Sequence, residues 1–204
     1  MQRTPWRYAQ GQIDNATSSR QILKMNQTLE DMIAREHIRC CIARLARGED
    51  RRDAACIAAS YWPDSVTDYG VVKGTFDEYL AWVVPGADAI SNTQHHIGQS
   101  HIELDGYSAR VETQVISYHR IDYGNKDEHD TVIGGRYLDV FEKRDGDWRI
   151  ASRLMLYDWF QDWGASVDWS QGVMGMPFSA PHFQGRSHDD YSVQFFQKSL
   201  DKEC

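Results

Sequence analysis

The stretch TQHHIGQSHIELDGYSARVETQVISYHRID, residues 93–122, contains two runs of strand-like sequence on either side of Asp105-Gly106. Asp-Gly between two such runs is a strong hairpin signal, because both residues tolerate the left-handed backbone of a tight turn. The stretch therefore predicts two long antiparallel strands, over about residues 93–104 and 109–122.

A second hairpin of the same kind follows a polar loop at residues 124–130. Strand-like sequence covers about residues 132–143, turns at Asp145-Gly146, and returns over about residues 148–159. Four long strands joined in sequence by tight turns favour an antiparallel sheet with one face against other elements.

Helical patterns precede these strands. Apolar residues recur at helical spacing from Leu29 to Leu45, and Gly48 is a plausible terminator. Asp53 can cap a second, short helix, and Thr75 with Glu78 forms a capping-box pattern for a third. Helices followed by long antiparallel strands predict an α+β fold.

The ends of the chain differ from this central part. Residues 1–26 are polar and aperiodic and predict an extended N-terminal arm. Residues 163–204 are rich in aromatic side chains without a clear period. We expect this C-terminal extension to pack on the central domain, residues 27–162, or on a neighbouring subunit.

Composition narrows the class of protein. The chain has 22 basic and 30 acidic residues, a net charge of −8, and no dense run of Lys or Arg. A nucleic-acid partner is therefore not expected. The sequence also shows no apolar signal core and no apolar stretch of about 20 residues, so we expect a cytoplasmic protein without a membrane partner.

Cysteine and histidine patterns give no metal signature. The four cysteines, Cys40, Cys41, Cys56 and Cys204, have no Cys-x-x-Cys spacing and are read as reduced thiols. Histidines that could bind zinc are His95, His96, His101, His119 and His129. Adjacent strand histidines point to opposite faces and cannot converge on one ion without a bulge, so a metal site is not expected.

The adjacent pair His95 and His96 is the strongest chemical feature of the first hairpin. Only one of the two can face a given cavity, because neighbours in a strand alternate between faces. Histidine titrates near neutral pH, so an inward-facing member is a candidate general base. Taken alone, the pair favours two half-buried structural histidines over a catalytic one.

Four segments together resemble one known family: EDRRD (49–53), TQHHIG (93–98), GGRYLDVFE (134–142) and DGDWRI (145–150). Their order and spacing resemble the SnoaL-like branch of the NTF2-like superfamily over about residues 27–162. The resemblance implies a cone-shaped α+β barrel, in which a curved, mostly antiparallel sheet wraps a pocket closed by the N-terminal helices.

The resemblance also implies a chemistry. Members of this group include scytalone dehydratase, bile-acid dehydratase, hexachlorocyclohexane dehydrochlorinase and polyketide cyclases, which use an Asp–His pair as a base without a cofactor. By the family's motifs, the Asp falls on Asp50 and the strand histidine before x-Gly falls on His96. A family arginine, five residues after the turn tryptophan, falls on Arg153 and would stabilise developing negative charge.

Aromatic residues are the candidates for lining the pocket. Tyr137 matches a pocket-wall position of the family, and the further candidates are Tyr61, Tyr69, Trp82, Tyr118 and Tyr157. The chain departs from the family at Leu45, where several dehydratases have a tyrosine five residues before the Asp. This departure weakens a specific match to bile-acid dehydratases.

These observations predict a cofactor-independent lyase for a hydrophobic, aromatic small molecule, with lignin-derived diaryl compounds among the candidates. Two alternatives remain open: an isomerase or cyclase that uses the same base, and a non-catalytic binding or assembly subunit. A binding subunit would not need Asp50 within hydrogen-bonding distance of His96. We further expect a homo-oligomer, either a dimer or a trimer.

Overall fold

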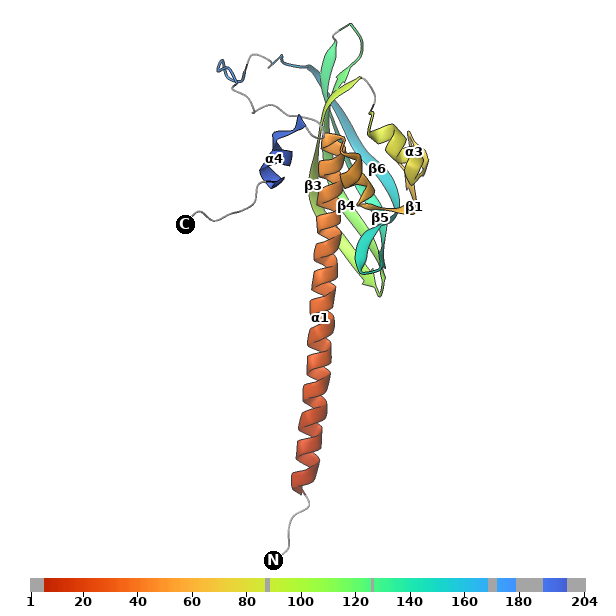
Figure 1. The fold of residues 1–204 in the computed structure, drawn as a ribbon, viewed down its shortest axis with the longest axis vertical. Coiled ribbons are helices and arrows are strands. Elements are labelled where there is room, and N and C mark those ends of the chain that lie inside the picture. Colours follow the sequence, from red (N-terminus) through yellow and green to blue (C-terminus); the bar gives the residue numbers. More distant parts are fainter. Residues whose placement is uncertain (1–5, 87–88, 126, 169–171, 179–188, 198–204) are drawn as a thin grey trace, which may run out of the picture.

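The computed structural model describes residues 6–86, 89–125, 127–168, 172–178 and 189–197 (Figure 1). Within them, two helices and two shorter strands precede a third helix, four long strands follow, and one short helix comes last. The elements are α1 (Trp6–Arg51), α2 (Ala54–Ala58), β1 (Tyr61–Asp68), β2 (Lys73–Thr75), α3 (Phe76–Val83), β3 (Ile90–Asp105), β4 (Ser108–Asp122), β5 (Glu128–Arg144), β6 (Asp147–Ala165) and α4 (Tyr191–Gln197).

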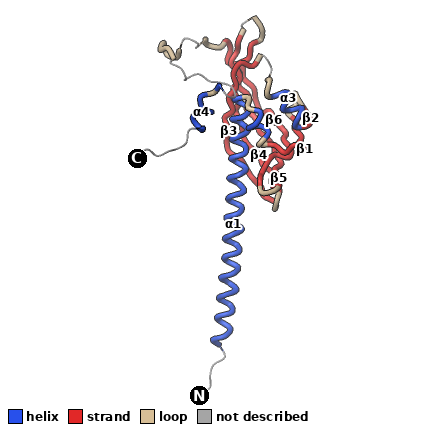
Figure 2. The backbone as a smooth tube through the Cα atoms, viewed as in Figure 1, coloured by secondary structure: helices blue, strands red, loops and turns tan. Residues whose placement is uncertain are grey.

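The six strands form one curved sheet in the order β2-β1-β6-β5-β4-β3 (Figure 2). Every neighbouring pair is antiparallel except β1 and β6. Both predicted hairpins are confirmed: Gly106 and Gly146 have φ values of 60° and 93°, which glycine adopts without steric cost. The α+β fold is confirmed, and the sheet is open, with β2 and β3 at its edges.

Helix α1 buries one stripe of its C-terminal half against the sheet. Ile38, Cys41, Ile42 and Leu45 are at most 2% exposed and recur at helical spacing. The helix runs past Gly48, contrary to the predicted end. A side chain at Gly48 would lie 2.9 Å from the Ile57 side chain, so the glycine allows close approach of α2.

The N-terminal part of α1 extends well beyond the sheet (Figure 1). The sequence pattern predicted an extended arm for residues 1–26, but the structure continues the helix back to Trp6. Extending an existing helix adds one hydrogen bond for each residue ordered and avoids the cost of nucleation. A polar segment next to a packed helix can therefore become helical without an apolar face of its own.

The predicted caps of the two short helices are confirmed. The Asp53 side chain accepts hydrogen bonds from the backbone N–H groups of Ala55 and Cys56 at the start of α2. Thr75 and Glu78 form the reciprocal capping box of α3. These caps set where α2 and α3 begin, and α3 then buries Phe76 and Tyr79 against the core.

The described part of the C-terminal extension contacts α1. Arg51 forms an ion pair with Asp190 at 2.9 Å, and Arg47 donates a hydrogen bond to Ser192 at 3.0 Å. Helix α4 therefore lies beside the end of α1 that enters the sheet (Figure 1). Cys40, Cys41 and Cys56 are free thiols, whereas Cys204 lies outside the described residues.

Among the described residues, no helix is both long enough and apolar enough to span a lipid bilayer.

Candidate active site

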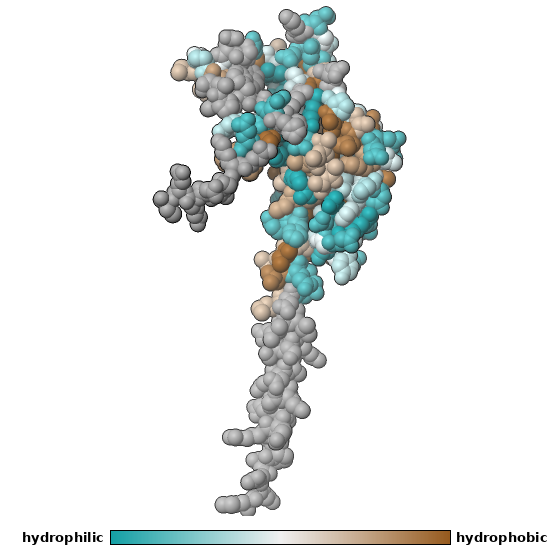
Figure 3. All heavy atoms as spheres, viewed as in Figure 1, coloured by the Kyte–Doolittle hydropathy of each residue, from teal (hydrophilic) through white to brown (hydrophobic). Residues whose placement is uncertain are grey.

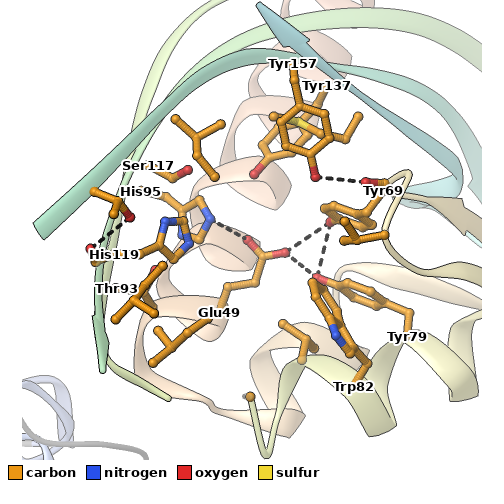
Figure 4. Close-up of a pocket in the computed structure, with 18 of the residues that line it drawn as sticks. Glu49, Tyr69, Tyr79, Trp82, Thr93, His95, Ser117, His119, Tyr137 and Tyr157 are labelled. Carbon is orange, nitrogen blue, oxygen red and sulfur yellow. Dashed lines mark hydrogen bonds and ion pairs between the residues drawn. The ribbon is translucent and has the colours of Figure 1, made fainter. Parts of the chain in front are cut away.

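A cavity of about 320 Å³ lies between the curved sheet and the helices α1 and α3 (Figure 4). Its walls are mainly apolar and aromatic, with a small polar group on one side. Apolar and aromatic lining residues include Val71, Trp82, Val83, Ile90, Ile121, Ile133, Met155 and Phe160. Such a cavity suits a small hydrophobic molecule held by a few polar contacts.

The polar side of the cavity contains an Asp–His pair. Nδ1 of His95 lies 2.7 Å from Oδ1 of Asp50. The same carboxylate accepts hydrogen bonds from the His95 backbone N–H, at 3.0 and 3.1 Å. Asp50 thereby fixes both the position of β3 and the orientation of the His95 ring, which lines the cavity.

The predicted contact between Asp50 and His96 is wrong. His96 is exposed on the outer side of β3, and His95 has the inward position. The reason is a bulge: Ser100 pairs with Thr113 but Ile97 pairs with Val115, which leaves one extra residue on β3. The bulge moves the inward face from even-numbered residues near Ile102 to odd-numbered residues near His95.

The surroundings of His95 favour its charged form. Burial disfavours the imidazolium, but the hydrogen bond that His95 donates to Asp50 and the negative charges of Glu49 and Asp50 outweigh it and raise the pKa of His95. A raised pKa makes His95 a stronger base. The arrangement can therefore accept a proton at Nε2 while Asp50 stabilises the resulting cation.

Glu49 is a second carboxyl beside His95; it lines the cavity, and it was not among the site residues predicted from the sequence. It is 5% exposed, and its Oε2 lies 3.7 Å from Nε2 of His95. Its Oε1 accepts hydrogen bonds from the hydroxyl groups of Tyr79 and, at 3.3 Å, Tyr69. Figure 4 shows Glu49 between the histidine and the two tyrosines.

The position of Glu49 could have been inferred from helical spacing. The inward stripe of α1 passes through Ile42 and Leu45, and Glu49 is the next residue on that stripe. A carboxyl at a core position of an amphipathic helix is rarely buried without a partner. That pattern was available from the sequence as a signal for a functional residue.

Strand β4 contributes a second histidine to the cavity. His119 pairs with Thr93 across the hairpin, and Ser117 pairs with His95. Burial, with a smaller effect of a positive His95, lowers the pKa of His119 to about 4, so the ring is neutral at neutral pH. The hairpin register could have identified His119 and Ser117, but only with the bulge in β3 taken into account.

Four of the six predicted aromatic residues line the cavity: Tyr69, Trp82, Tyr137 and Tyr157. Tyr61 lies behind them, with its hydroxyl 3.4 Å from that of Tyr69. Tyr118 points to the other face of β4, because it alternates with Ser117 and His119, and it donates a hydrogen bond to Asp130 at 2.7 Å. The predicted lining role of Tyr61 and Tyr118 is therefore wrong.

Arg153 lies beneath the cavity and not on its wall. Its guanidinium makes two hydrogen bonds of 2.8 Å to Asp139, and both side chains are at most 1% exposed. It stacks 3.8 Å from the Tyr137 ring centre. Burial opposes its charge, but the ion pair with Asp139 outweighs this and raises the pKa of Arg153. The arginine supports the aromatic wall and does not face the cavity as predicted.

Among the described residues, no group of three or more His, Cys, Asp or Glu side chains is arranged to hold a metal ion. His95, His101 and His129 each contact a carboxylate, and these contacts lie at separate places in the sheet. The polar groups of the cavity instead bond to one another: Glu49 accepts hydrogen bonds from Tyr69 and Tyr79, and its other oxygen faces His95.

Comparison with known proteins agrees with this geometry. No curated protein matches the sequence of the chain. In structure the chain is similar to hexachlorocyclohexane dehydrochlorinase LinA-type3 from Novosphingobium barchaimii LL02, with a TM-score of 0.60 and 18% identity, covering 75% of this chain and 99% of that one. It is also similar to a candidate scytalone dehydratase from Novosphingobium aromaticivorans DSM 12444, with a TM-score of 0.57, 21% identity and coverage of 70% and 94%.

A third structural neighbour is an NTF2-like superfamily protein from Salmonella enterica, with a TM-score of 0.56, 14% identity and coverage of 71% and 97%. At these identities the likeness shows the fold. The family model named SnoaL-like domain matches residues 30–154, which include α2, α3, all but the N-terminal part of α1, and the strands up to the middle of β6. The chain therefore belongs to the SnoaL-like domain family.

Proposed function

We propose that this protein is a cofactor-independent lyase that removes a proton from a hydrophobic, aromatic small molecule and expels a leaving group. The observation that carries the proposal is the 2.7 Å contact of His95 Nδ1 with Asp50, with the ring at the wall of an apolar cavity. A non-catalytic binding subunit has no need of an oriented histidine with a raised pKa.

The mechanism follows from the orientation of the ring. Asp50 accepts a hydrogen bond from Nδ1–H, so the neutral ring carries its lone pair on Nε2, which faces the cavity. Nε2 removes a proton from carbon beside an activating group, and the electron pair forms a double bond as the leaving group departs. Asp50 stabilises the imidazolium throughout. The apolar walls exclude water, which strengthens these electrostatic effects.

The cavity also supports the substrate class. Its volume of about 320 Å³ is near the lower limit of ligand pockets, roughly 300–1,000 Å³. Trp82, Tyr137 and Tyr157 offer ring faces and edges on which an aromatic substrate can pack. Compounds with one or two rings fit this description, and lignin-derived diaryl compounds belong to that class. The structural neighbours named as dehydrochlorinase and dehydratase agree with elimination chemistry.

The proposal can be tested with a probe that needs only a base in an apolar pocket. A nitro-substituted benzisoxazole loses the proton on its isoxazole carbon, its N–O bond breaks, and a coloured cyanophenolate forms. We expect His95→Ala to lower the rate by about 10² to 10⁴. Asp50→Asn should also lower it, because the charged acceptor at Nδ1 is lost.

The chain provides a matched control in His96→Ala. This variant removes the neighbouring imidazole from the exposed face of the same strand and should leave the rate unchanged. Circular dichroism should show that all three variants fold. Equal rates for wild type and His95→Ala would refute the assignment. With candidate natural substrates, a product that has lost mass indicates a lyase, whereas unchanged mass indicates an isomerase or cyclase.

We also propose that the chain assembles with copies of itself through α1. Met25, Leu29, Met32 and Ile33 form one apolar stripe on the part of the helix beyond the sheet, and each is 47–65% exposed (Figure 3). Two or three such stripes could bury one another as in a helical bundle. Light scattering should show a dimer or trimer that Leu29→Glu dissociates, and a monomeric wild type would contradict the proposal.

A further inference from the structure

Glu49 is not needed for proton abstraction by the Asp50–His95 pair, yet it lies in the same cavity. A carboxyl that is 5% exposed must be hydrogen-bonded to offset the cost of removing it from water. Both tyrosine hydroxyls that satisfy it, from Tyr69 and Tyr79, bind the same oxygen, Oε1. The other oxygen, Oε2, is directed toward His95 (Figure 4).

The distance between Oε2 and Nε2 of His95 is 3.7 Å. A hydrogen bond between them needs a shift of about 0.5–1 Å, since such bonds join heavy atoms roughly 2.7–3.2 Å apart. Rotation of the imidazole is limited, because Asp50 holds its other nitrogen. A proton taken up at Nε2 therefore has Glu49 as its nearest acceptor among the carboxylates of the cavity wall.

We propose that Glu49 is the general acid of the reaction and protonates the leaving group. The inference rests on the proposed lyase function and names the group that completes it. The proton removed from carbon binds Nε2 of His95 and then passes to Oε2 of Glu49. From there it passes to the leaving oxygen as the bond between that oxygen and carbon breaks. The electron pair of the C–H bond forms the new double bond. The electron pair of the C–O bond stays on the oxygen, which leaves, once protonated, as water or an alcohol.

The two tyrosines act as positioning residues. Burial, together with nearby negative charge including that of Glu49, raises the pKa of Tyr69 and of Tyr79 well above the ordinary value of 10. They are therefore weaker acids than a carboxyl and remain protonated as hydrogen-bond donors. By holding Oε1 they leave Oε2 as the oxygen that can bind and release a proton.

This assignment narrows the class of substrate. A halide leaves without a proton, so a dedicated acid offers it little. A hydroxyl or alkoxyl group is a poor leaving group until it is protonated, and an acid beside it accelerates departure by about 10² to 10⁴. Glu49 therefore favours substrates that lose an oxygen leaving group over substrates that lose a halide.

The test compares leaving groups of different basicity. Benzisoxazoles with a nitro group release a weakly basic phenolate, whereas the unsubstituted compound releases a phenolate of ordinary basicity. We expect Glu49→Gln to slow the elimination of the unsubstituted compound by about 10² more than that of the nitro compound. Glu49→Asp keeps a carboxyl and should restore part of the lost rate. His96→Ala should change neither rate.

The outcomes separate this inference from the proposed function. If Glu49→Gln slows both compounds by the same factor, Glu49 has a structural role and the inference is overturned. If His95→Ala has no effect on either compound, the base itself is misassigned and the proposed function fails.

A second measurement does not depend on turnover. The ring resonances of His95, assigned by their loss in His95→Ala, can be titrated by NMR in wild type and in Glu49→Gln. Loss of the neighbouring charge should lower the pKa of His95. An unchanged titration midpoint would show that Glu49 and His95 are not coupled, and it would overturn the relay even if no benzisoxazole were turned over.

Discussion

Replacement of Arg153 with methionine tests whether its buried ion pair supports the fold or takes part in chemistry. The guanidinium and the Asp139 carboxylate are at most 1% exposed and share two hydrogen bonds of 2.8 Å. Methionine fills similar space but leaves the Asp139 carboxylate buried without its partner. Loss of one member of such a pair typically costs about 3–5 kcal/mol of unfolding free energy.

Thermal unfolding is a suitable assay. For a chain of this size, each kcal/mol lowers the melting temperature by about 2–4 °C, so Arg153→Met should lower it by about 6–20 °C. The double variant Arg153→Met with Asp139→Leu should recover most of the loss, because the unpaired charge is then also removed. A single variant within about 1 kcal/mol of wild type would refute the structural role of the pair.

The pH dependence gives an independent check. Without Arg153, burial raises the pKa of Asp139 in the folded state above its value in the unfolded chain. The folded state then binds more protons, so stability decreases as the pH rises. The loss of unfolding free energy caused by Arg153→Met should therefore be smaller at about pH 5 than at about pH 8. A deficit independent of pH would mean that Asp139 is not left charged and buried.

Three further predictions concern stability. The raised pKa of His95 contributes stability that is complete below the unfolded value near 6.5 and is lost as the pH rises through the folded-state pKa. In urea unfolding, the difference in unfolding free energy between wild type and His95→Gln should therefore be larger at about pH 6 than at about pH 9. An equal difference at both pH values would contradict this. Thr75→Ala removes the α3 cap and should cost about 0.5–2 kcal/mol in the same assay, with Thr75→Ser close to wild type. Gly135→Ala places a methyl group 2.2 Å from the Leu156 carbonyl oxygen and should lower the unfolding free energy by about 1–3 kcal/mol. An unchanged unfolding free energy would mean that the β6 backbone shifts to accommodate the methyl group.

The hairpins and caps were predictable because their signals are local. Asp145-Gly146 forms the second turn as expected, with both residues at positive φ. The first turn lies one residue later than expected, at Gly106-Tyr107, because Asp105 still pairs with Ser108. The capping box at Thr75 depends on side chains three residues apart. The strands extend beyond the predicted ends, since pairing continues wherever a neighbour supplies hydrogen bonds, and that information is not local.

The choice between His95 and His96 was not predictable from alternation. A bulge adds one residue to β3 between Ile97 and Ser100, and it reverses the faces of residues 92–97, up to a second irregularity between Ile90 and Asn92. Gly98 within this interval is compatible with a bulge but does not require one. The functional histidine was thus correctly predicted to be one of this adjacent pair. Which of the two faces the cavity depends on the register between β3 and β4, which local sequence does not determine.

The positions of Arg153 and Tyr61 depend on contacts between distant segments. Arg153 was expected on the cavity wall, but its partner Asp139 comes from the adjacent strand and draws it beneath Tyr137. Tyr61 lies on β1, whose parallel pairing with β6 sets its depth in the core. Neither the Arg153–Asp139 ion pair nor the pairing of β1 with β6 can be inferred from residue spacing within one helix or strand.

The end of α1 beside the cavity has a consequence for folding. Helix backbones carry a partial negative charge at their C-terminal end, where cations are favoured and carboxylates are not. Glu49 and Asp50 both lie in the last turn of α1, so each destabilises that turn of the isolated helix. Strand β3 brings two donors to this carboxyl-rich end, since the backbone N–H and Nδ1 of His95 both hydrogen-bond Asp50. Docking of the sheet against this helix end therefore offsets the unfavourable interaction of the two carboxylates with the helix C-terminus. The residues proposed for chemistry thus also couple the formation of the last turn of α1 to that of the β3–β4 hairpin.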